Sequence, residues 1–195
     1  MIEIDHNKIY ESHGYRFKNF VCLSDEEKRM VLEWRNSPDV RKWMYNKDII
    51  KLEDHLRFIE QLENKDDRYY WLVLSPSGDY IGVYDITSVD REKDFAEAGY
   101  YLNPSPEYLG EGLPFVKECL CFFFFVLSIG NTYGAVDKNN VNAYIMSKYL
   151  GAIYMEEKDN YFITRAYDKE LFKKRYNESS LDFITYFKKE KKLFK

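Results

Sequence analysis

Glu107-Tyr108-Leu109-Gly110-Glu111-Gly112 is the stretch that decides the fold of this chain. It lies between a strand-like run, residues 95–102, and an apolar run that extends to about residue 127. At the start of a helix the first backbone N–H groups have no partner within the helix, and the helix dipole favours an anion. Glycine lets the backbone approach a ligand closely and adopt a positive φ. The stretch therefore predicts a phosphate-binding loop. A lone Gly-x-Gly is more often an ordinary turn, and that reading stays open.

The runs on either side of this loop predict one α/β (α+β) domain. We expect strands at residues 15–23, 69–74, 80–89, 95–102, 132–136, 153–157 and 161–167. We expect helices from Ser24, from Ser37-Pro38, at 52–62, from the glycine loop to about 127, and at 140–150. This order predicts a twisted, mostly antiparallel mixed sheet flanked by helices. We expect the domain to span residues 1–167 and a helical tail, 168–195, to pack on it or extend from it.

Composition and charge exclude several classes of protein. The chain has 195 residues, of which 45% are hydrophobic, which is enough for one domain with a sizeable core. A net charge of −4 gives no general basic field for nucleic acid. The three cysteines, Cys22, Cys119 and Cys121, are too few for a disulfide framework, and we expect no metal site. No apolar run is long enough to span a bilayer, and residues 1–5 do not resemble a signal peptide, so we expect a cytoplasmic protein.

A second segment supports the first. It reads Asn140-Val141-Asn142-Ala143-Tyr144-Ile145-Met146-Ser147-Lys148-Tyr149-Leu150-Gly151. Together with the glycine loop and the order of elements, it resembles the GNAT superfamily of N-acetyltransferases over about residues 15–167. The superfamily's loop is Gln/Arg-x-x-Gly-x-Gly/Ala, and its second signature is Asn-x-x-Ala-x-x-x-Tyr-x-x-x-Gly. This chain departs from them at Glu107 and at Ser147, which stands where the superfamily has tyrosine.

The resemblance implies acetyl-CoA as the acyl donor. Its pyrophosphate would be bound by the backbone amides of Leu109, Gly110, Glu111, Gly112 and Leu113. The run 95–102 would supply backbone groups to the pantetheine arm, and an amide near Tyr101 or Leu102 would polarise the thioester carbonyl. Asn140 would contact the pantetheine or, more simply, cap its helix. The side chains of Glu107 and Glu111 must point outward, since a carboxylate beside a phosphate is repelled.

The catalytic candidates are a base and a proton donor. Glu97 would deprotonate the acceptor ammonium, because only the free amine is nucleophilic; the alternative is an ordinary solvated carboxylate. The departing thiolate needs a modest proton donor, which is tyrosine in the superfamily. Ser147 occupies that position, and Tyr144 and Tyr149 lie nearby on the same helix. His55 is expected to pack or hydrogen-bond on its own helix rather than act as the base.

A narrower resemblance lies near the N-terminus, in Trp34-Arg35-Asn36-Ser37-Pro38, Met44-Tyr45 and His55-Leu56-Arg57-Phe58. It is similar to the amino-sugar-nucleotide acetyltransferases of pseudaminic acid synthesis, which acetylate the 4-amino group of a UDP-linked sugar. In a site for such a substrate, Arg35 and Asn36 would bind a nucleotide phosphate or an amide, and Trp43, Met44 and Tyr45 would stack on a uracil ring. The alternative is helix packing by Trp34 and Trp43, with Arg35 in a salt bridge.

The expected function is direct acetyl transfer to the primary amine of a nucleotide-linked amino sugar, in surface-glycan or nonulosonic acid synthesis. The expected partners are acetyl-CoA, this amine and a second copy of the chain in a homodimer. Two alternatives stay open. One is a protein N-terminal acetyltransferase of the ribosomal-protein type, which has a related Trp-Arg-Asn opening. The other is a non-catalytic module that binds CoA.

Overall fold

The computed structural model describes residues 1–194, which form two compact units, Met1–Gly130 and the part that begins at Asn131. The first unit contains β1 (Tyr10–Ser12), β2 (Tyr15–Asn19), a 3₁₀ turn (Phe20–Cys22), α1 (Asp25–Asn36), α2 (Pro38–Arg41), α3 (Leu52–Leu62), β3 (Tyr69–Leu74), β4 (Tyr80–Asp90), β5 (Phe95–Leu102), a 3₁₀ turn (Pro106–Tyr108), α4 (Gly112–Cys121) and a π-helical turn (Phe122–Val126). The second unit contains β6 (Asn131–Asp137), α5 (Val141–Tyr149), β7 (Ala152–Lys158), β8 (Tyr161–Tyr167), α6 (Lys169–Tyr176), α7 (Ser180–Lys191) and a 3₁₀ turn (Lys192–Phe194).

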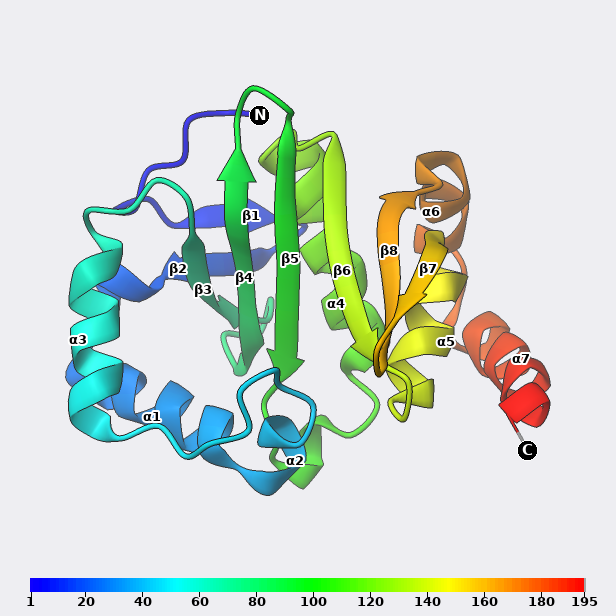
Figure 1. The fold of residues 1–195 in the computed structure, drawn as a ribbon, viewed down its shortest axis with the longest axis horizontal. Helices are drawn as coiled ribbons and strands as arrows, with labels where there is room; N and C mark the ends of the chain where they lie inside the picture. Colours follow the sequence, from blue (N-terminus) through cyan, green and yellow to red (C-terminus); the bar gives the residue numbers. More distant parts are fainter. Residues whose placement is uncertain (195) are drawn as a thin grey trace. The chain divides into compact units, whose positions relative to one another are not determined.

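The predicted fold class, an α/β fold with a mostly antiparallel sheet, is confirmed. In the first unit the strands run in the order β1-β2-β3-β4-β5, and each is antiparallel to its neighbour. In the second unit the order is β6-β8-β7, again antiparallel. Figure 1 shows β3, β4 and β5 side by side, with α3 and α1 near one another. Among residues 1–194, no helix combines the length and apolar character that crossing a membrane requires.

Helix α1 begins where the sequence predicts it. The hydroxyl of Ser24 accepts a hydrogen bond from the Glu27 N–H, and the Glu27 carboxylate accepts one from the Ser24 N–H at 2.7 Å, which completes a capping box. The same carboxylate accepts hydrogen bonds from the ammonium of Lys18 and the hydroxyl of Tyr80. Glu27 therefore ties the start of α1 to β2 and β4.

Strand alternation sorts the side chains of the first unit onto two faces. On one face, Leu72 and Val83 pack with Val31 and Trp34 of α1, and with apolar side chains of α3. On the other face, Phe122 of the π-helical turn stacks on Phe17 at 3.9 Å between ring centroids. Trp71, Tyr84 and Phe115 are buried on that second face. The first face, under α1, also carries the polar residues described below.

The first predicted strand, residues 15–23, is wrong at its C-terminal end. β2 ends at Asn19, because the Asn19 side chain accepts a hydrogen bond from the Val21 N–H and caps a 3₁₀ turn. The sequence reading also missed β1, whose three residues pair with β2 through a tight turn at His13-Gly14.

The C-terminal segment folds as two helices in the second unit. The hydroxyl of Tyr149 in α5 donates to Glu178 at 2.6 Å, and the ring of Tyr149 contacts those of Phe183 and Tyr186 in α7. Arg175 lies over the same ring, 4.6 Å from its centroid. These contacts fasten α7 to α5. The division into residues 1–167 and 168–195 stays a prediction.

Candidate active site

The glycine loop is a helix N-terminus with three unused amides. Gly110 adopts a φ of +104°, and α4 begins at Gly112. The N–H groups of Leu109 and Glu111 donate to the carbonyls of Pro106 and Tyr108 within the preceding turn. Those of Gly110, Gly112 and Leu113 find no acceptor within residues 1–194. Of the five amides expected to hold a pyrophosphate, these three are available to an anion, where the dipole of α4 favours one.

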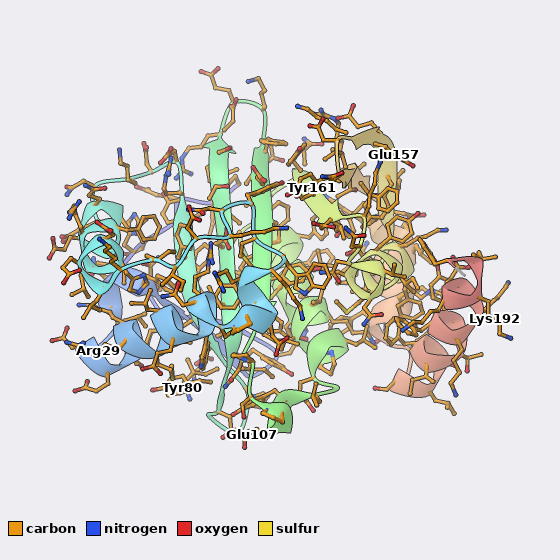
Figure 2. All side chains as sticks on the ribbon, turned by 60° about the horizontal axis from the view of Figure 1, so that its bottom comes forward. Arg29, Tyr80, Glu107, Glu157, Tyr161 and Lys192 are labelled. Carbon is orange, nitrogen blue, oxygen red and sulfur yellow. The ribbon has the colours of Figure 1, made fainter. Side chains whose placement is uncertain are left out.

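The two carboxylates of this loop are exposed, as the sequence requires of a phosphate site. Glu107 accepts a hydrogen bond from the Ser105 hydroxyl at 3.0 Å, and Figure 2 shows it at the outer edge of the first unit, on the segment before α4. Glu111 precedes the first residue of α4. Because both side chains are in solvent, their repulsion of a bound phosphate is screened.

The backbone of β5 presents alternate amides to alternate edges. The N–H of Asn103 donates to Ile81 of β4, and Tyr101 pairs with Val83 two residues earlier. Antiparallel alternation therefore directs the Tyr101 amide toward β4 and the Leu102 amide away from it. Of the two amides expected to polarise a thioester, that of Leu102 is on the edge away from β4.

Two carboxyl groups lie together on the α1 face of β4 and β5. In the register of these strands Asp85 pairs with Gly99, and Thr87 pairs with Glu97, so Asp85 and Glu97 are diagonal neighbours on one face. Both are half-buried. Burial, followed by the charge of Glu97, raises the pKa of Asp85 to about 7. Burial also raises the pKa of Glu97, against a hydrogen bond from Tyr45. Sequence reasoning found Glu97 and missed Asp85.

The segment between α2 and α3 is anchored by side chains that the sequence assigned to substrate. Asn36 donates to the Ile50 carbonyl at 2.8 Å and accepts from the Ile50 N–H at 2.9 Å. Arg35 donates through Nη2 to the Asn46 carbonyl at 2.7 Å. Its Nη1 is buried and makes no hydrogen bond within residues 1–194. Arg35 and Asn36 thus position this segment, and one guanidinium nitrogen remains for a ligand.

The anchored segment carries the remaining substrate candidates. Trp43 and Met44 are half-buried, and Lys42 lies over the Trp43 ring at 5.4 Å. The side chain of Tyr45 is largely exposed, yet its hydroxyl bonds to Glu97. The structure therefore brings Tyr45, Glu97 and Asp85 into one cluster.

The second unit carries the proton-donor candidates on α5. Asn140 caps this helix by accepting from the Ala143 N–H at 3.3 Å. Ser147 is buried, and its hydroxyl donates to the Ala143 carbonyl at 2.9 Å. The hydroxyl of Tyr149 is engaged by Glu178. The ring of Tyr144 stacks on that of Tyr154 and packs at a tilt against that of Phe162, and its hydroxyl makes no hydrogen bond within residues 1–194.

His55 packs as the sequence predicts. It is buried, its Nε2 lies 3.0 Å from the Lys28 carbonyl, and burial lowers the pKa of its imidazole. It therefore joins α3 to α1 and lies outside the carboxyl cluster.

One set of side chains has the atoms of a metal-binding group. His13, Glu118 and Cys121 place their ligand atoms within 4.8 Å of one another. The Glu118 carboxylate accepts a hydrogen bond from Ser12 at 3.0 Å and lies 3.1 Å from His13 Nδ1. These contacts fasten the β1–β2 hairpin to α4. The expected absence of a metal site stays a prediction.

Comparison with known proteins identifies the family. The family model of the acetyltransferase (GNAT) domain matches residues 20–153. Acetyltransferase PseH of Campylobacter jejuni is 31% identical over 149 residues, 76% of this chain and 91% of that protein. The structure of C. jejuni N-acetyltransferase PseH in complex with acetyl coenzyme A superposes with a TM-score of 0.63 at 22% identity, over 79% of this chain and 99% of the other.

A second enzyme shares the fold at lower identity. The spermidine N-acetyltransferase of Vibrio cholerae, in complex with CoA and spermine, superposes with a TM-score of 0.64 at 12% identity, over 82% of this chain and 99% of the other. Both resemblances stated from the sequence, to the superfamily and to its pseudaminic-acid branch, are confirmed by these matches. The chain belongs to the GNAT superfamily of N-acetyltransferases.

Proposed function

We propose that this protein transfers an acetyl group from acetyl-CoA to the primary amine of a nucleotide-linked amino sugar, by direct attack in a ternary complex. The observation that carries the donor half is the set of unused amides at Gly110, Gly112 and Leu113. They form an anion site at the N-terminus of α4, which suits a pyrophosphate. The solved PseH relative is described with acetyl coenzyme A bound, which supports the same donor here.

The acceptor half is supported by the cluster on the α1 face. Half-buried carboxylates such as Glu97 and Asp85 attract an ammonium, and a carboxylate can remove its proton. The unpartnered Nη1 of Arg35 suits a phosphate oxygen of a nucleotide. The rings of Trp43 and Tyr45, with Met44, offer apolar surface to a base. The 31% identity to PseH, over most of both chains, supports an amino-sugar acceptor.

For the departing thiolate we propose Tyr144 as the proton donor. Of the three α5 candidates, Ser147 donates to its own helix and Tyr149 to Glu178, whereas the Tyr144 hydroxyl has no acceptor within residues 1–194. The amide of Leu102 would polarise the thioester carbonyl. The cytoplasmic location is supported by three unpaired cysteines. The homodimer stays a prediction.

The first experiment is calorimetric titration with acetyl-CoA, followed by an acetylation assay with a UDP-4-amino sugar. Binding and turnover that UDP inhibits competitively would support the proposal. Turnover of an N-terminal peptide that UDP leaves unchanged would replace it with the protein acetyltransferase alternative. Binding of acetyl-CoA with no turnover of sugar, peptide or spermidine would leave the non-catalytic CoA-binding module.

A further inference from the structure

The strand register places Asp85 directly across β5. An ideal Cβ on Gly99 would lie 2.8 and 2.9 Å from the two carboxyl oxygens of Asp85. Such contacts are shorter than van der Waals distance, so the Asp85 carboxyl occupies the space that any other residue at position 99 would fill. Because Glu97 projects from the same face two residues earlier, glycine at 99 lets Asp85 lean toward Glu97.

Among the described residues, the two carboxyls have no cationic partner. Within residues 1–194 neither Asp85 nor Glu97 takes part in an ion pair. The guanidinium of Arg35 influences the hydroxyl of Tyr101 rather than either carboxyl. The groups that feel the charge of Asp85 are Tyr70 on β3, Tyr101 on β5 and Cys119 on α4, all neutral at pH 7.

Two half-buried carboxylates without a counter-ion are unfavourable when both are ionised. Either one holds a proton or a cation binds between them. Burial and the charge of Glu97 accordingly raise the pKa of Asp85 to about 7. The hydrogen bond from Tyr45 acts the other way on Glu97 and helps to keep that carboxyl ionised. The two members of the pair therefore differ: Tyr45 donates a hydrogen bond to Glu97, whereas burial and the charge of Glu97 raise the pKa of Asp85.

We propose that Asp85 and Glu97 form the site that receives the ammonium group of the acceptor, and that Asp85 takes its proton. This inference rests on the proposed function. When the ammonium binds, its positive charge replaces the proton that one of the carboxyls would otherwise hold. One N–H proton of the ammonium then passes to an Asp85 oxygen. The nitrogen lone pair then attacks the thioester carbon, forming the C–N bond. The C–S bond breaks, and the departing thiolate takes up the second proton of the amine. Asp85 releases its proton to solvent.

The assignment of Asp85 also names a class of acceptor. Two carboxylates at one place match a cationic primary amine better than a neutral hydroxyl or an amide. Glu97 then acts on the reaction in two ways. Its charge raises the pKa of Asp85, and it attracts the positive charge of the bound ammonium. Tyr45 acts as a positioning residue, because it holds Glu97 from the segment that carries the other acceptor candidates.

The test compares Asp85→Asn, Glu97→Gln and Asp85→Glu with the wild-type protein, and uses Asp90→Asn as the matched control. Asp90 lies on the same strand, half-buried and paired with Lys93. Acetylation of the amine that the wild type accepts best is followed from pH 5.5 to 9, and acetyl-CoA affinity is measured by calorimetry. Asparagine cannot take a proton, so Asp85→Asn should lose activity by about 100-fold or more while acetyl-CoA affinity is unchanged. Asp85→Glu should recover part of the activity.

The pH profile separates the proposal from a merely structural role. Removing the charge of Glu97 lowers the pKa of Asp85, so the acidic limb of kcat/KM should move to lower pH in Glu97→Gln and stay in place in Asp90→Asn. An acidic limb that does not move in Glu97→Gln, or an Asp85→Asn variant that keeps more than one-tenth of the activity, would overturn the proposal.

A readout without turnover covers the case in which the proposed function itself fails. The side-chain carboxyl carbon of Asp85 is titrated by ¹³C NMR, with and without ethylammonium as the cation. The midpoint should fall on adding ethylammonium and should fall in Glu97→Gln. If the wild type acetylates no amine but these shifts occur, the cation site stands and the transfer reaction fails. If neither shift occurs, the pair is not a cation site.

Discussion

Asp85 and Gly99 face each other across β4 and β5, and the carboxyl oxygens of the first lie 2.8 and 2.9 Å from where the second would carry a Cβ. Gly99→Ala should therefore push the Asp85 carboxyl away from Glu97. We expect a loss of activity of about 10-fold or more with acetyl-CoA affinity retained, measured by acetylation kinetics and calorimetry. Gly134→Ala is the control, because its new methyl meets only Thr164 at 3.1 Å in the second unit. Equal activity in Gly99→Ala and the wild type would show that the position of the Asp85 carboxyl relative to Glu97 does not affect catalysis.

The stability of the protein should depend on Asp85 and on pH. A folded-state pKa raised from 3.8 to about 7 means that the stability contributed by this group is present below pH 4 and lost as pH rises through 7. Asp85→Asn removes that loss. The variant should therefore gain stability over the wild type between pH 5 and pH 8, by up to about 4 kcal/mol. Thermal unfolding of both proteins across this range is the measurement, and a difference that is flat with pH would contradict the raised pKa.

Glu27 should stabilise the fold in the opposite pH range. Burial opposes its ionisation, but hydrogen bonds from Lys18, the Ser24 N–H and Tyr80 lower the pKa below 4.5 overall. A lowered folded-state pKa gives stability that is present above pH 4.5 and lost as pH falls through the lower value. Glu27→Gln should cost about 2 kcal/mol at pH 7 and less at pH 3, by denaturant unfolding. Glu33→Gln, exposed on the same helix, should be neutral.

Glu111 should weaken the binding of acetyl-CoA. Its exposed carboxylate immediately precedes the unused amide of Gly112, where a phosphate would bind. Glu111→Gln removes the repulsion and should tighten the dissociation constant by about 2- to 10-fold, more at low salt than at high salt. Glu107→Gln serves for comparison, since its carboxylate is turned to Ser105 and should matter less. Unchanged affinity in Glu111→Gln at low salt would place the phosphates elsewhere.

Substitutions of Tyr144 and Tyr149, both on α5, should separate an effect on catalysis from an effect on stability. Tyr149→Phe loses the 2.6 Å hydrogen bond to Glu178 and should cost about 1–2 kcal/mol of unfolding free energy, with kcat retained. Tyr144→Phe loses a hydroxyl without a described acceptor, so it should lower kcat and leave thermal unfolding nearly unchanged. The opposite pattern, with kcat lost in Tyr149→Phe alone, would assign the proton donor to Tyr149.

Local signals in the sequence were sufficient for most of the helices. Ser24 with Glu27, and Ser37 before Pro38, mark helix starts that the structure confirms. The strands flanking Ser75–Asp79 were equally readable, because a tight turn needs those residue types. β1 could not be read, since its three residues are held by pairing with β2 and by contacts to α4 from distant sequence.

The site was only partly predictable. A glycine loop before an apolar helix is visible in sequence, because its chemistry belongs to the backbone. Asp85 cannot be recognised in this way. Its place between Tyr84 and Ile86 fits the ordinary alternation of a strand, in which the acidic residue faces solvent. Its burial and its approach to Glu97 depend on tertiary packing and on the absence of a side chain at Gly99, neither of which the local sequence shows. Arg35 and Asn36 were predicted to bind substrate because their side chains suit a phosphate or an amide, whereas the structure shows them bonded to Asn46 and Ile50.

The anchoring of the segment between α2 and α3 has a consequence for how acceptor preference can change. Arg35, Asn36 and Arg41 hold this segment largely through its carbonyls, which every amino acid possesses. Its path is therefore set mainly by the helices rather than by its own side chains. Substitutions at Trp43, Met44, Asp48 and Ile49, which leave Tyr45 and Asn46 in place, can alter the surface offered to an acceptor with little cost in folding free energy. Evolution, or an engineer, can retune specificity there while the carboxyl pair keeps the chemistry.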